Sequence, residues 1–204
     1  MSLRTVASSL LTLGAVIVAG CGPGAGSQDS LGSDSAISHA AGAHAVARRL
    51  DVHGPRVTDD GLMELAGRPE IERIWIRGTP NVTGAGFKAC GTWPNLRSVS
   101  LLNVPISDAT AFEFVTRSET LEELKVCALQ LSQEHVAQIA ESDSLLELWF
   151  QEVEGLDAEN LLRLGKLSTL RSLSIVDCPG VEPEDIEALQ ALLPACPIHY
   201  KMLK

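Results

Sequence analysis

The sequence predicts an α/β solenoid, in which similar units stack side by side, parallel strands form one sheet and helices cover one side of it. A pattern of apolar, two free positions, apolar, one free position, apolar occurs five times, 24 or 25 residues apart. One such unit cannot bury its apolar face alone, so the units must stack on one another. The copies begin at Ile71, Leu96, Leu121, Leu145 and Leu170.

A second periodic signal predicts one helix between successive strands. An apolar residue is followed by a side chain that can cap a helix, again at intervals of 24 or 25 residues. Thr, Ser and Asp accept a backbone N–H at this position, and Pro183 suits the first helical turn. These helix starts are Val57-Thr58, Val82-Thr83, Ile106-Ser107, Leu131-Ser132, Leu156-Asp157 and Val181-Glu182.

The L-x-x-L-x-L core at this period is typical of a leucine-rich repeat. We therefore expect residues 46–204 to form a short leucine-rich-repeat horseshoe, with a parallel β-sheet on the concave face and helices on the convex face. Ala45–Val52 fits a degenerate first strand, and Leu193–Tyr200 fits a divergent last one. Pro197 lacks a backbone donor, which favours an edge strand there.

Residues 1–20 are typical of an export signal and are kept out of the fold. Arg4 precedes an apolar stretch, and Val18-Ala19-Gly20-Cys21 ends it. This ending resembles the lipobox of bacterial lipoproteins. The resemblance implies cleavage after Gly20, a lipid such as palmitate on Cys21, and a location at the bacterial cell envelope, on the outer membrane in a Gram-negative cell. The alternatives are an ordinary cleaved signal or a free cysteine.

Residues 21–45 are rich in Gly, Ala and Ser. Such a composition buries too little apolar area to offset chain entropy. We expect a flexible tether between the lipid and the folded domain.

The charge balance excludes one class of partner. The chain has 16 basic and 26 acidic residues, and removal of residues 1–20, which contain one basic residue, leaves 15 − 26 = −11. Nucleic acid is therefore not expected as a partner. No stretch after residue 20 has the roughly 20 apolar residues that a membrane-spanning helix needs.

One short phrase carries a family resemblance. Val57-Thr58-Asp59-Asp60-Gly61-Leu62, echoed at residues 82–87 and 106–109, resembles the V-T-D-x-G-L repeats of bacterial leucine-rich-repeat proteins common in planctomycetes and similar to the cysteine-containing class. The ending at residues 193–198 is similar to the L-P-x-C-x-I ending of that group. The resemblance covers about residues 46–202 and implies a short β/α horseshoe used for binding.

Alternation along the strands places the candidate binding residues on the concave face. Two tryptophans point outward there beside basic side chains, a composition typical of interface hot spots. We expect a protein or peptide ligand; self-association or a structural role in the envelope is the alternative, and Lys125 stacking on Trp149 would leave no binding role for that pair. The predicted binding residues are Arg73, Trp75, Arg77, Ser100, Glu123, Lys125, Glu147, Trp149 and Gln151.

Catalysis, cofactors and metals have little support in the sequence. Cys127 is the one candidate nucleophile, and no histidine lies within a strand of it in the predicted register. His135 falls in a helix first turn, and the spacing of Cys178 and Cys196 argues against a disulfide. We expect no enzyme activity, no cofactor and no metal site.

Overall fold

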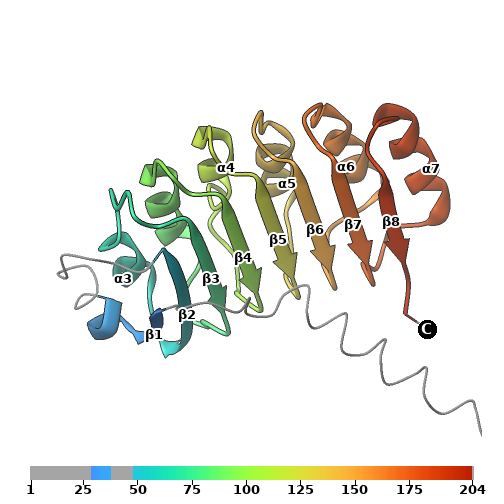
Figure 1. Ribbon diagram of the computed structural model, residues 1–204. Coiled ribbons are helices and arrows are strands. Elements are labelled where there is room, and N and C mark those ends of the chain that lie inside the picture. Colours follow the sequence, from blue (N-terminus) through green and yellow to red (C-terminus); the bar gives the residue numbers. More distant parts are fainter. Residues whose placement is uncertain (1–28, 38–47, 204) are drawn as a thin grey trace, which may run out of the picture.

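The computed structural model describes residues 29–37 and 48–203. The predicted signal segment and Cys21 lie outside these residues. Within them, eight strands form a single parallel sheet in chain order, and helices cover one side of it (Figure 1). The strands are β1 (Asp29–Ser33), β2 (Arg49–Arg56), β3 (Arg73–Arg77), β4 (Ser98–Leu102), β5 (Glu123–Cys127), β6 (Glu147–Gln151), β7 (Ser172–Val176) and β8 (Ile198–Lys201).

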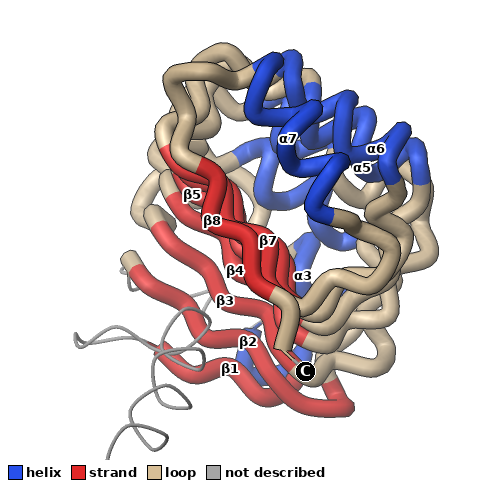
Figure 2. The backbone as a smooth tube through the Cα atoms, turned by 90° about the vertical axis from the view of Figure 1, so that its right-hand side faces the viewer, coloured by secondary structure: helices blue, strands red, loops and turns tan. Residues whose placement is uncertain are grey.

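The helical elements form a second layer (Figure 2). They are α3 (Asp59–Met63), η1 (Ala85–Thr92), α4 (Glu113–Arg117), α5 (Gln133–Ala140), α6 (Ala158–Arg163), η2 (Leu164–Lys166) and α7 (Pro183–Leu192). The described residues include no helix with the length and hydrophobicity that crossing a membrane requires.

The core lies between the sheet and the helices, as the apolar pattern predicts. Ile74 and Ile76 of β3 have no exposed area, and the neighbouring strands bury the equivalent residues. Phe114 on the helix side packs edge-on against Phe87, with ring centroids 6.2 Å apart. Each unit thus buries its apolar side chains against both neighbours, which is how a repeat array obtains its stability.

The first ordered unit begins earlier than the sequence predicted. Within the expected tether, residues 29–33 form β1, which pairs with β2, and residues 34–37 form a helical turn. Leu31 and Ile37 are buried, so this segment differs from a tether because two aliphatic side chains join the core. The remaining residues assigned to the tether, 21–28 and 38–45, lie outside the described part of the chain.

Two predicted helix starts are wrong in detail. In the second repeat the helix is a 3-10 helix whose N-cap residue is Gly84, with a φ of 104° and no side-chain cap hydrogen bond. In the third, Asp108 accepts a hydrogen bond from the Thr110 backbone and forms a local turn, so α4 begins only at Glu113. The caps at Thr58, Ser132 and Asp157 are confirmed.

Two aspartates, Asp34 and Asp59, each bind the helix start of the next repeat, and we call these contacts the carboxylate ladder. Asp59 accepts hydrogen bonds from the Thr83 backbone (2.9 Å) and hydroxyl (2.7 Å), and from the backbones of Gly84 (3.2 Å) and Gly86 (2.8 Å). Asp34 binds Thr58 in the same way, at 2.9 Å to the backbone and 2.6 Å to the hydroxyl. A side chain on Gly86 would lie 2.7 Å from the Asp59 carbonyl oxygen, so this position needs glycine.

Replacement of Asp59 tests the ladder. Asp59→Ala leaves four donors without their carboxylate, and hydrogen bonds to a charged group contribute about 1.5–3 kcal/mol. We expect the free energy of unfolding to fall by about 2–3 kcal/mol in urea denaturation. Asp60→Ala is the matched control, since Asp60 is exposed in the same helical turn and its interaction with the helix dipole contributes about 1 kcal/mol or less. Equal losses in the two variants would contradict the ladder.

Candidate functional site

The open face of the sheet, defined as the side that the helices do not cover, carries the outward residues of the strands. The parallel register arranges these outward residues in three rows that run across the strands. Across β2 to β8, the first row is Arg49, Arg73, Ser98, Glu123, Glu147 and Ser172, the second is Asp51, Trp75, Ser100, Lys125, Trp149, Ser174 and His199, and the third is His53, Arg77, Leu102, Cys127, Gln151, Val176 and Lys201.

The predicted binding residues all lie on this face, but few are fully exposed. Arg73 and Glu147 are exposed, whereas Trp75 and Trp149 are half-buried, as are Arg77, Glu123, Lys125 and Gln151. Ser100 is buried at 6% exposure between larger neighbours in its row. The remaining tryptophan, Trp93, lies in the core, where its indole N–H donates to the Leu65 carbonyl at 2.7 Å.

A bidentate ion pair holds the β2–β3 end of the open face. Arg77 Nε donates to Asp51 Oδ1 at 2.9 Å, and Nη2 donates to Oδ2 at 2.8 Å. Asp51 is only 3% exposed. The hydrogen bond to Asp51 raises the pKa of Arg77 above its usual value, against the lowering effect of burial. Arg77 is thus held by the protein itself, which the row pattern did not reveal.

A cavity of about 250 Å³ lies on the other half of the open face, and we name it the open-face cavity. It brings together four of the predicted residues: Glu123, Lys125, Glu147 and Trp149. Arg73, Trp75, Arg77, Ser100 and Gln151 do not line it. The rest of its lining is Leu124, Leu148, Ser172, Ser174 and His199, of which the last three belong to the rows of the open face but were not among the predicted binding residues.

Glu123 is the best-connected carboxylate of this cavity. It accepts a hydrogen bond from Ser98 Oγ at 2.6 Å and pairs with Lys125 Nζ at 2.7 Å. Burial acts to raise the pKa of Glu123, but the bonds from Lys125 and Ser98 outweigh it, so the pKa lies below its usual value. The alternative that stacks Lys125 on Trp149 finds no support, because the ammonium is directed to Glu123.

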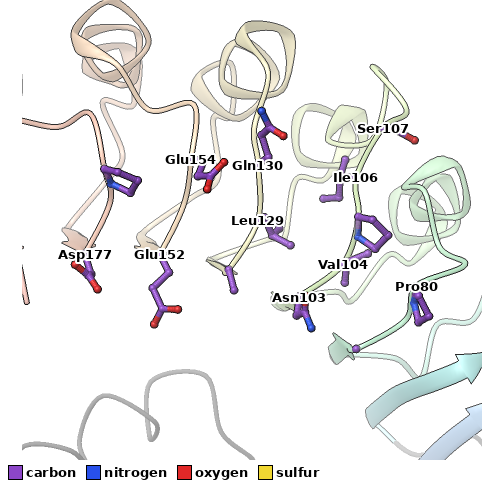
Figure 3. Close-up of a pocket in the computed structure, with 14 residues that line it drawn as sticks. Pro80, Asn103, Val104, Ile106, Ser107, Leu129, Gln130, Glu152, Glu154 and Asp177 are labelled. Atoms are coloured by element: carbon purple, nitrogen blue, oxygen red, sulfur yellow. The ribbon is translucent and has the colours of Figure 1, made fainter.

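A second depression, the edge groove, follows the carboxyl ends of the strands (Figure 3) and measures about 900 Å³. One residue after each of five strands has a positive φ, and its N–H donates to the next strand, as Asn103 N does to the Cys127 carbonyl at 3.0 Å. Glu152, Glu154 and Asp177 line it with prolines and aliphatic residues. Although it is larger, its lining lacks aromatic and basic side chains, so the open face offers the more varied binding groups. The five residues with a positive φ, one after each strand from β3 to β7, are Gly78, Asn103, Ala128, Glu152 and Asp177.

Three free thiols and His135 have structural surroundings in the described part of the chain. Burial raises the pKa of Cys90 to about 12, and burial also raises those of Cys178 and Cys196, so these three free thiols stay protonated at neutral pH. Cys127 is 2% exposed. His135 caps its own helix: its Nδ1 accepts from Ser132 N at 3.1 Å, and its Nε2 lies 2.9 Å from the Asp108 carbonyl oxygen. Across residues 29–37 and 48–203, no three His, Cys, Asp or Glu side chains are grouped to hold a metal ion.

Acidification tests the Glu123 cluster. A carboxyl with a lowered folded-state pKa adds stability that is present above the unfolded-state pKa, about 4.3, and is lost as the pH falls through the folded-state value. The difference in unfolding free energy between the wild type and Glu123→Gln should therefore be largest at neutral pH and shrink as the pH falls below about 4.3. Urea denaturation at several pH values measures it. Lys125→Gln should also reduce the pH dependence, and a difference that does not vary with pH would contradict the cluster.

Comparison with known proteins gives no match from which a function could be inferred. No protein-family model matches the chain, and no curated protein matches it. The open face, with its aligned aromatic, acidic and basic side chains and a cavity among them, is therefore the candidate binding site.

Proposed function

We propose that the chain is a leucine-rich-repeat horseshoe that binds a protein or peptide through its open face, which is the concave face of that fold. The single observation that carries the proposal is the second row of the register, which aligns Trp75, Ser100, Lys125 and Trp149 across four neighbouring strands. The L-x-x-L-x-L units and the V-T-D-x-G-L phrases support the repeat family.

The tryptophans supply the main physical argument. Tryptophan is enriched among residues that dominate binding energy, and a half-buried ring offers a rigid apolar surface that needs little further ordering. Trp75 and Trp149 are separated by three strand spacings, or roughly 14 Å at about 4.8 Å each. An extended segment of four or five residues spans that distance at about 3.3 Å per residue, so one peptide can contact both rings.

We also propose that the domain is displayed on a lipid anchor at the bacterial cell envelope. The supporting observation is Val18-Ala19-Gly20-Cys21, which resembles a lipobox. Seven residues lie between Cys21 and the start of β1 at Asp29, so the eight Cα–Cα steps from Cys21 to Asp29 reach at most about 26–29 Å when extended. The open face would thus act close to the membrane surface.

Capture of envelope proteins tests the binding role. The chain lacking residues 1–21 should retain a partner from an envelope extract, and Trp75→Ala with Trp149→Ala should lower that capture more than tenfold, as expected for hot-spot side chains. Met63→Ala with Leu162→Ala is the matched control, because both residues are exposed apolar side chains of the helix layer. Equal losses in the two double variants would contradict binding through the open face.

Size-exclusion chromatography of the same proteins separates ligand binding from the alternative of self-association. A larger mass that disappears in the tryptophan double variant would favour self-association. An unchanged monomer mass in both proteins would favour a separate ligand.

Lipid labelling tests the anchor. The wild-type chain should incorporate radiolabelled palmitate in a bacterial host, and Cys21→Ala should abolish the incorporation because the thiol that carries the lipid is gone. Incorporation at the wild-type level in that variant would remove the lipid anchor from the proposal.

A further inference from the structure

Two carboxylates stand directly opposite each other on the open face. Glu123 of β5 and Glu147 of β6 are register partners. Like charges at directly opposite positions of neighbouring strands destabilise a sheet. The fold therefore keeps a locally unfavourable pair of charges on the wall of a cavity.

The protein neutralises only one of these carboxylates. Glu123 holds the ammonium of Lys125 and the hydroxyl of Ser98. Among the described residues, the carboxylate of Glu147 has no ion-pair or hydrogen-bond partner. The next residue in its row is Ser172, which brings no positive charge from β7. One negative charge of the cavity is left for a ligand.

Trp149 supplies a second recognition element. Trp149 lines the same cavity as Glu147. The aromatic face attracts a cation, and tryptophan does so most strongly of the aromatic residues. Its Nε1–H is buried and has no hydrogen-bond partner among the described residues. A peptide brings both a carbonyl acceptor and, on a basic residue, a cation.

We propose that the open-face cavity receives a lysine or arginine side chain of the partner, with its cation between Glu147 and the ring of Trp149. This inference rests on the proposed function and specifies the chemistry of the ligand. Charge complementarity selects a basic side chain over the others, since Lys125 already neutralises Glu123. An acidic side chain would meet the unpaired carboxylate of Glu147, and an apolar one would displace water from that carboxylate without offering it a hydrogen bond. The serines at the β7 side leave space beside the ring for the aliphatic stem.

Small probes test the cavity in the full-length chain carrying Cys21→Ser, which prevents lipidation. The probe is N-acetyl-L-lysinamide, and N-acetyl-L-norleucinamide is its uncharged match. Indole N–H signals of the nitrogen-15-labelled protein are followed by NMR, with the Trp149 signal identified by Trp149→Phe. We expect lysinamide to shift the Trp149 signal in a saturable way, and norleucinamide to bind at least about fivefold more weakly because it lacks the charge.

Two variants complete the test. Glu147→Gln should weaken lysinamide about fivefold, whereas Glu152→Gln, an exposed acid one residue beyond the end of the same strand, should leave it unchanged. Equal binding of the two probes, no saturable shift, or equal effects of the two variants would each overturn the inference. If partner capture depends on the tryptophans but not on Glu147, the proposed function stands and this inference alone fails.

Discussion

The hydrogen bonds between parallel strands of successive repeats are the interaction on which the rest of the structure depends. Each inner strand takes its backbone partners from the repeat before and the repeat after, in an unbroken register from β2 to β8. This register fixes which side chains enter the core and which share a row on the open face. The rows of aromatic and charged residues are therefore a direct product of the backbone pairing.

Most of the fold could be predicted because the apolar residues recur at one repeat length, and alternation within each strand then decides which side chains point inward. The strands, their inward residues and the register all follow from where the apolar residues lie. The unit at β1 was missed because its Gly and Ser content favoured a tether. A weaker signal was present: Ser33, Asp34 and Ile37 precede Thr58, Asp59 and Leu62 by 25 residues each.

The candidate site could be predicted only as a surface, without its internal pairing. Alternation placed Arg77 and Lys125 outward, but it did not show that Asp51 and Glu123 hold them. Such pairs join side chains from different rows, and they depend on side-chain torsions that a sequence pattern does not specify. The open-face cavity likewise arises where small serines of β7 stand beside the larger Trp149 of β6.

The helix layer is uneven along the array, and this has a consequence for how the molecule comes apart. α3 and α4 have five residues each and η1 is a 3-10 helix, whereas α5 has eight residues and α7 has ten. In a linear array each unit is stabilised only by its neighbours, so the least-supported end frays first. Amide protons of β2 and β3 should thus exchange with solvent ahead of those in β5 to β7, and the end with short helices can open while the cavity near Trp149 keeps its shape.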